Sequence, residues 1–213
     1  MKKTVIVILL IIGFTNNFAQ NDAKAKKLLD EVSLNMTSYK TIYVEFKNTL
    51  ENIEESLRQD TKGTAYLKGE KYLVNFLGTT TIFDGTKNYL INPEDEEVNI
   101  SNPEDSDEIT PAKFFSFYKE GYNYSWDILQ NINGLKVQFV KLIPIASDSE
   151  MKYVLLGIDS KTKNIYKLIQ VGKNGTNYTL TITKLKTNLD LSNKLFEFNK
   201  SKYETEGYII NDL

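Results

Sequence analysis

Two clusters of acidic residues hold most of the side chains that could carry out chemistry. They occupy residues 94–97 (Glu-Asp-Glu-Glu) and 104–108 (Glu-Asp-Ser-Asp-Glu). Paired carboxyl groups in a cleft could hydrolyse a glycoside, and oxygen ligands that alternate around a glycine could bind calcium. Neither cluster has that alternation, and each follows a turn proline, Pro93 or Pro103. We therefore interpret both clusters as solvated turns and predict no metal site and no catalytic residue.

The residue composition excludes most other catalytic chemistry. The 213 residues include no histidine and no cysteine, which rules out Ser-His-Asp and Cys-His catalysis, the usual zinc ligands, His- or Cys-ligated haem and disulfides. Arg58 is the only arginine, and the net charge is −2, which argues against binding to nucleic acid through general phosphate attraction. We expect a protein that needs no cofactor and binds no nucleic acid.

An aromatic segment in the middle of the chain is more informative than the acidic clusters. Thr110 and Pro111 fit the N-cap and the first position of a helix, which the sequence predicts over residues 110–118. Four of its residues are aromatic: Phe114, Phe115, Phe117 and Tyr118. Such a helix could pack in a core or close the mouth of an apolar cavity, and composition alone leaves both possibilities open.

The N-terminal residues have the features of a secretory signal. Lys2 and Lys3 give a positive start, residues 5–12 are continuously apolar, and Ala19 offers a small-residue cleavage site. The apolar run is about half of the roughly 20 residues that a membrane-spanning helix needs. We predict that residues 1–19 are a signal peptide cleaved near Ala19, and that residues 20–213 form one exported domain.

An amphipathic helix is predicted over residues 21–38, with Asp22 as its N-cap. Its apolar stripe has helical spacing and includes Leu28, Leu29 and Val32. A stripe of this kind is typical of a helix that packs on a sheet.

From Thr41 onward the apolar residues alternate with a period of two, in short segments that end at residues 196–198. Turn signals separate the segments, and the tetrapeptide Asn-Pro-Glu-Asp predicts reversals at residues 92–95 and 102–105. With two helices among about eleven strands, the sequence predicts an α+β fold. Its large, strongly curved antiparallel sheet would be covered by helices on one face.

Several short motifs follow one another in a specific order between residues 25 and 200. They are Phe46, Gly63-x-x-Tyr66-Leu67-Lys68, Asp84-Gly85-Thr86-Lys87-Asn88-Tyr89, Asn92-Pro93, Thr110-Pro111, Asn174-Gly175-Thr176-x-Tyr178 and Phe196-x-Phe198. In order and spacing they resemble the LolA family of periplasmic outer-membrane lipoprotein carriers.

This resemblance implies an open half β-barrel whose concave face is covered by helices. In the family, the apolar cavity between sheet and helices shields the acyl chains of a lipoprotein between the inner and outer membranes. The resemblance therefore implies a monomeric periplasmic chaperone for protein transport, not an enzyme. Its partners would be acylated lipoproteins as cargo, an inner-membrane lipoprotein-releasing transporter and an outer-membrane acceptor.

One motif of the family is missing. The Arg-Pro after the second strand, whose arginine latches the lid helices in the family, is replaced by Gly69-Glu70, and Arg58 lies too early to be its simple equivalent. We expect either another latch or a more open cavity.

The residues that line the cavity are predicted from strand alternation and from the apolar faces of the two helices. Alternation separates the two faces of a strand but does not say which is concave, so a shift of one residue would invert a strand's contribution. The predicted lining is Leu28, Leu29, Val32, Val44, Phe46, Tyr72, Val74, Phe76, Ile82, Phe114 and Phe115.

Two other functions remain open from the sequence. The first is a LolA-like regulatory module that senses lipid or lipoprotein and signals through a partner. Such proteins usually carry a second domain, which we do not expect here. The second is a periplasmic hydrolase that uses the acidic clusters, which would require two carboxyl groups with perturbed pKa values in one pocket.

Overall fold

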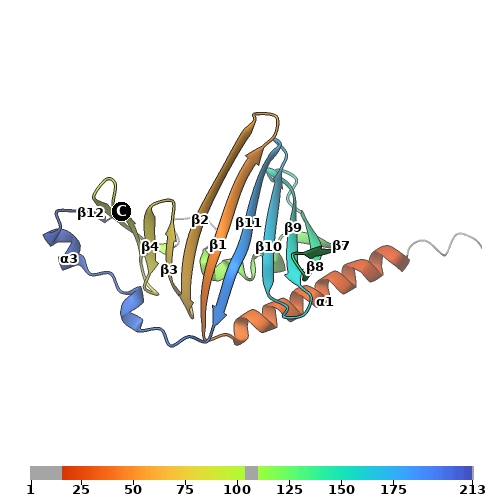
Figure 1. Ribbon diagram of the computed structural model, residues 1–213, viewed down its shortest axis with the longest axis horizontal. Helices are drawn as coiled ribbons and strands as arrows, with labels where there is room; N and C mark the ends of the chain where they lie inside the picture. Colours follow the sequence, from red (N-terminus) through yellow and green to blue (C-terminus); the bar gives the residue numbers. More distant parts are fainter. Residues whose placement is uncertain (1–15, 104–109, 213) are drawn as a thin grey trace, which may run out of the picture.

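The computed structural model describes residues 16–103 and 110–212, and one twelve-stranded sheet forms most of it (Figure 1). The strand order is β12-β6-β5-β4-β3-β2-β1-β11-β10-β9-β8-β7. Neighbouring strands are antiparallel, except that β12 runs parallel to β6. The sheet is open, which confirms the predicted α+β class with a large antiparallel sheet.

The strands are β1 (Thr41–Asn52), β2 (Leu57–Lys68), β3 (Lys71–Phe76), β4 (Thr79–Phe83), β5 (Asn88–Asn92), β6 (Glu97–Ser101), β7 (Tyr122–Ile132), β8 (Leu135–Pro144), β9 (Met151–Asp159), β10 (Ile165–Gly172), β11 (Thr176–Thr187) and β12 (Ile209–Asp212). The helices are α1 (Asn16–Ser38), α2 (Pro111–Phe114), α3 (Lys200–Thr205) and two 3₁₀-helices, η2 (Phe117–Lys119) and η3 (Asn193–Phe196).

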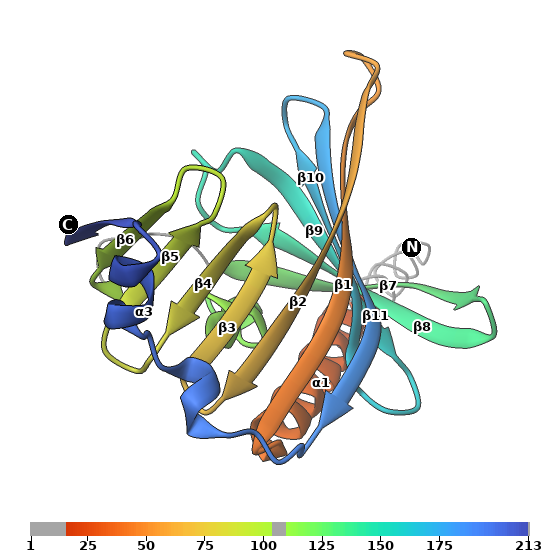
Figure 2. The same cartoon turned by 60° about the vertical axis from the view of Figure 1, so that its left-hand side comes forward.

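Helices lie on both faces of the sheet. In Figure 2, α1 and α2 lie behind the sheet, on its concave face, while η3 and α3 cross the convex face in front. Helix α1 packs on the half of the sheet that contains β7, and its apolar stripe is buried there, with Leu29 2% and Val32 0% exposed. Facing core residues such as Leu142 and Leu156 are fully buried, so this half of the concave side is filled solid.

Helix α1 begins earlier than the sequence predicts. It starts at Asn16 instead of residue 21, so Asp22 lies within the helix and the predicted N-cap is wrong. No glycine or proline occurs between residues 16 and 21, so nothing in that segment interrupts a helix. The predicted signal peptide falls largely on residues 1–15, outside the described residues. No helix in the part of the chain that the structure describes is long and apolar enough to cross a membrane.

The C-terminal segment forms a second, smaller core on the convex face. Apolar residues of β4, β5 and β6, among them Ile82 and Val98, are buried under it. The ring of Phe198 stacks on Tyr89 with centroids 4.5 Å apart. The predicted strand over 196–198 is wrong, because η3 ends there at Phe196, and the last strand is β12, which the sequence did not predict.

The predicted helix over residues 110–118 is divided into α2 and η2. Thr110 caps α2 as predicted, since its side chain accepts a hydrogen bond from the backbone N–H of Lys113. On a continuous α-helix these four aromatic side chains would spread over about 160° of the surface. The tighter η2 turn instead buries Tyr118, which is 1% exposed and donates a hydrogen bond to the carbonyl of Leu29.

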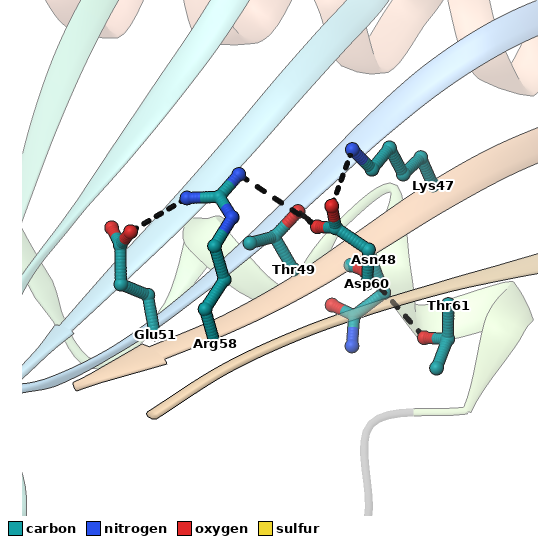
Figure 3. A network of polar contacts seen from close by, with 7 residues as sticks. All are labelled: Lys47, Asn48, Thr49, Glu51, Arg58, Asp60 and Thr61. Atoms are coloured by element: carbon teal, nitrogen blue, oxygen red, sulfur yellow. Dashed lines mark hydrogen bonds and ion pairs between the residues drawn. The ribbon is translucent and has the colours of Figure 1, made fainter. Parts of the chain in front are cut away.

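The hairpin of β1 and β2 projects beyond the rest of the sheet (Figures 1 and 2). Its outer face carries a polar network (Figure 3), in which Arg58 contacts Glu51 at 2.6 Å and Lys47 contacts Asp60 at 3.0 Å. Hydrogen bonds from Thr49 and Lys47 hold the pKa of Asp60 below its ordinary value. Solvent-exposed pairs of this kind contribute little to stability.

The turn between β4 and β5 is organised by the carboxylate of Asp84. It accepts hydrogen bonds from the backbone N–H groups of Thr86 and Lys87 at 2.8 and 2.9 Å and from the Tyr89 hydroxyl at 2.9 Å. Gly85 has φ +100°, which disfavours a side chain there. Burial opposes ionisation of Asp84, but these hydrogen bonds outweigh it and lower the pKa of Asp84. Burial and the same contact raise the pKa of Tyr89 to about 12.

We expect Asp84→Asn to lower the free energy of unfolding at neutral pH by about 1 kcal/mol, because a neutral amide oxygen accepts the same backbone hydrogen bonds more weakly than a carboxylate does. The pKa of Asp84 in the folded state is below its unfolded-state value of about 3.9. The stabilisation by its carboxylate is therefore fully present above about pH 3.9 and is lost as the pH falls through the folded-state pKa. Urea unfolding of both proteins at neutral and at acidic pH measures it. A difference that persists unchanged into acid would contradict the assignment.

Candidate functional site

An apolar hollow lies between α2 and the concave side of β1, β2, β3 and β11. Its volume is about 180 Å³. We call it the apolar hollow, and every residue that lines it is apolar: Val44, Phe46, Ala65, Leu67, Val74, Pro111, Phe114, Phe115, Leu180 and Ile182. No charged group of the described residues lines it, so it is suited to hydrocarbon rather than to acid–base or metal chemistry.

Strand register brings the lining residues of the sheet onto one face. Val44 is paired with Ala65, and Ala65 in turn with Val74. On the other side of β1, Phe46 is paired with Ile182 across a bulge between Glu45 and Phe46. Residues that are paired across antiparallel strands point to the same side of a sheet, so these side chains form one continuous apolar floor.

Gly63 makes room for the largest side chain of that floor. A Cβ atom at Gly63 would lie 2.4 Å from Cζ of Phe46 and 2.8 Å from the backbone oxygen of Asn75. The ring of Phe46 therefore lies directly across the backbone of β2, and its far side meets Phe76, with ring centroids 5.6 Å apart. Any larger residue at position 63 would displace this ring.

The roof of the apolar hollow is α2 with the aromatic residues that follow it. Phe114 and Phe115 contact each other edge to face at 5.2 Å. Tyr118 fastens the segment to α1 through its hydrogen bond to the Leu29 carbonyl, and Tyr124 donates hydrogen bonds to the carbonyls of Tyr118 and Lys119. Burial raises the pKa of Tyr118, which remains a neutral donor.

Five of the predicted lining residues meet at the apolar hollow: Val44, Phe46, Val74, Phe114 and Phe115. Phe76 contacts Phe46 but lies just outside the hollow. Tyr72 lies on the same face and lines a separate small hollow with Phe83.

Four of the predicted lining residues lie away from the apolar hollow. Leu28, Leu29 and Val32 of α1 belong to the solid core, because α1 packs over the other half of the sheet. Ile82 is paired with Leu73 rather than with Tyr72. It therefore points to the convex face and belongs to the second core. The hairpin between β3 and β4 reverses the relation between residue number and face, which the sequence alone did not determine.

Five lining residues were not predicted: Ala65, Leu67, Pro111, Leu180 and Ile182. A signal for two of them is present, since Leu180 and Ile182 share the apolar face of an alternating segment. Their position next to β1 was not predictable, because β11 is about 130 residues away along the chain. Ala65 is too small to suggest a binding role by itself.

The other candidate groups lie away from the apolar hollow. The acidic cluster at residues 94–97 begins in the exposed turn between β5 and β6, where its first three residues are exposed; the cluster at 104–108 lies outside the described residues. No group of three acidic residues in the described ranges is arranged to hold a metal ion. Arg58 lies in the polar network of the β1–β2 hairpin, on the face opposite Phe46, and does not contact α2.

The match to a family model covers most of the chain. Residues 37–199 match the model described as outer membrane lipoprotein carrier protein LolA. No curated protein sequence is significantly similar to the chain.

Solved structures share the fold at low sequence identity. An uncharacterized conserved protein from Thermus thermophilus is 11% identical with a TM-score of 0.57, and the match covers 89% of this chain and 99% of that one. MucB is 12% identical with a TM-score of 0.52, over 84% of this chain and 64% of that one. A putative outer membrane lipoprotein-sorting protein domain from Vibrio parahaemolyticus is 14% identical with a TM-score of 0.46, over 86% and 100%.

Proposed function

Because the chain belongs to the LolA family, we propose that it is a periplasmic carrier that shields lipoprotein acyl chains and ferries them from the inner to the outer membrane. The observation that supports this most directly is the apolar hollow, whose lining contains no charged or polar side chain. Residues of this kind can cover hydrocarbon but offer no group for bond making or breaking. We propose no catalytic activity.

Shielding is the physical requirement that such a carrier must meet. Burial of each acyl methylene is worth about 0.8 kcal/mol, so a multiply acylated anchor does not cross an aqueous compartment unaided. Release requires only that the acceptor offers a more favourable apolar environment than the carrier. An inner-membrane lipoprotein-releasing transporter would load the monomeric carrier, and an outer-membrane acceptor would unload it. Cleavage near Ala19 would deliver residues 20–213 to the periplasm.

A loading and transfer assay tests the carrier function. The purified chain is incubated with a synthetic triacylated lipopeptide, and the complex is separated by gel filtration and identified by native mass spectrometry. We expect a complex with one lipopeptide and none with the unacylated peptide. Loaded protein is then mixed with lipid vesicles, and lipopeptide is expected to move to the vesicles.

Two outcomes would contradict the proposal in different ways. If the lipopeptide and its unacylated control behave alike, the hollow does not bind acyl chains. If the lipopeptide binds but moves neither to vesicles nor to an outer-membrane fraction that contains the acceptor, the carrier function is contradicted and the regulatory alternative is favoured.

A further inference from the structure

We propose that Phe115 is a movable partition between two hollows, and that a bound acyl chain runs through both. The hydrocarbon end would lie in the apolar hollow, and the end with the acyl carbonyl would lie in the second hollow. This inference rests on the proposed function, because it specifies how the same site receives its ligand.

The second hollow lies between the C-terminal end of α1 and the start of β1. Its volume is about 250 Å³, and we call it the mixed hollow. It shares two lining residues with the apolar hollow, Leu67 and Phe115. Its other lining residues are Ser33, Met36, Thr37, Tyr39, Lys40, Thr41, Ile42, Gly69 and Ser116.

Neither hollow alone is large enough for a fatty acyl chain. A cavity of about 150 Å³ takes one benzene molecule, and the apolar hollow has about 180 Å³. Pockets that hold a drug-sized ligand have volumes of roughly 300–1,000 Å³, more than the volume of either hollow. A long acyl chain therefore fits only if the two hollows join or if the roof moves, and the shared wall is the shortest route between them.

Of the two shared residues, Phe115 is the one that can move. Leu67 belongs to the interior of β2 and is 5% exposed, so its position is set by pairing with β1 and β3. Phe115 lies at the C-terminal end of α2 and is half-buried. It packs against the edge of the main core without being fully buried, and its ring contacts that of the preceding residue, Phe114. Tyr118, by contrast, is fastened to α1, so the ring of Phe115 can turn while the roof stays anchored.

The difference in polarity between the two hollows sets the direction in which the acyl chain lies. The apolar hollow is lined by hydrocarbon alone, whereas the mixed hollow adds polar groups, among them the ammonium group of the exposed Lys40. The hydroxyls of Thr37, Thr41 and Ser116 donate to backbone carbonyls, so Lys40 is the donor that can meet an acyl carbonyl, which costs less free energy there than in a purely apolar cavity. The methyl end therefore belongs under Phe114 and the carbonyl end near Lys40. A lipoprotein anchor and a phospholipid both present this chemistry.

The dependence of affinity on acyl-chain length tests the partition. Lipopeptides whose acyl chains lengthen from octanoyl to palmitoyl are titrated against the purified chain and against Phe115→Trp and Phe115→Ala. We expect the affinity of the wild type to rise about four-fold per methylene across the series. Phe115→Trp enlarges the partition, so we expect its affinity to stop rising at a short acyl-chain length. The affinity of Phe115→Ala should continue to rise with chain length. A parallel series of lysophospholipids shows which source of acyl chain the site accepts.

Phe198→Leu is the matched control, since Phe198 is also half-buried but packs in the second core on the convex face and lines neither hollow. It should follow the wild-type length dependence. If the wild type and Phe115→Trp level off at the same chain length, the partition is refuted even though acyl chains bind. If no lipopeptide or lysophospholipid binds at any length, the proposed function itself fails.

Discussion

Leu180→Glu is expected to lower the affinity for a triacylated lipopeptide by roughly 100-fold or more. The side chain of Leu180 lines the apolar hollow, in which no charged group of the described residues takes part. A carboxylate there would lose hydration when an acyl chain enters, and the cost of burying an unpaired charge is several kcal/mol. The affinity is measured by titration of the purified protein with the lipopeptide.

Thr181→Glu provides the matched control for this substitution. Thr181 is the next residue of β11, so its side chain points to the opposite face of the sheet, where Lys47 and Lys167 are its cross-strand partners. A carboxylate at this position meets positive charge and solvent, and binding should stay within about three-fold of the wild type. If both substitutions lower the affinity equally, the loss comes from a general disturbance of β11 and not from a charge in the apolar hollow.

The two halves of the concave face differ in how completely they are filled. Under α1 the face is filled by fully buried residues such as Val140 and Leu156. Under α2 the floor of Val44, Phe46 and Val74 is left partly uncovered. A stable core can thus hold the sheet together whether the apolar hollow is empty or occupied.

Much of the fold follows from patterns that depend on neighbouring residues. Strand alternation before residue 188, the reversal at residues 92–95 and the Thr110 cap all act over a few residues, and these predictions agree with the structure. The reversal predicted at residues 102–105 falls partly outside the described residues. The division of the segment 110–118 did not follow, because it depends on the distant contact between Tyr118 and Leu29. The strand β12 was missed for the same reason, since its pairing partner β6 lies more than 100 residues earlier in the chain.

The site was predictable only as far as local alternation reaches. Val44 and Phe46 alternate with polar residues, and Val74 follows from pairing across the short hairpin of β2 and β3. Ile82 lies on the convex face because the hairpin between β3 and β4 reverses the relation between residue number and face. Leu180 and Ile182 were not predicted because their neighbouring strand, β1, is far away along the chain. The curvature belongs to the sheet as a whole, so the sequence of a single strand does not show which of its faces is concave.

Gly63→Ala is expected to lower the free energy of unfolding by about 1–3 kcal/mol, as overpacking of a well-packed site does. The added Cβ atom would lie 2.4 Å from the Phe46 ring and 2.8 Å from the Asn75 carbonyl oxygen. The backbone oxygen cannot yield without distorting β3, so the ring has to leave its position. Since Phe46 forms part of the floor of the apolar hollow, affinity for the lipopeptide should fall as well. Urea unfolding and titration measure the two effects.

Gly63→Ala combined with Phe46→Leu separates the two contacts. Leucine at position 46 removes the ring atoms nearest to the new Cβ, so the double substitution should cost less than the two single costs added together. The remaining loss then reports the contact with the Asn75 carbonyl oxygen. Strict additivity would mean that the Phe46 ring does not rest on Gly63, and the packing that we infer for the floor of the apolar hollow would be wrong.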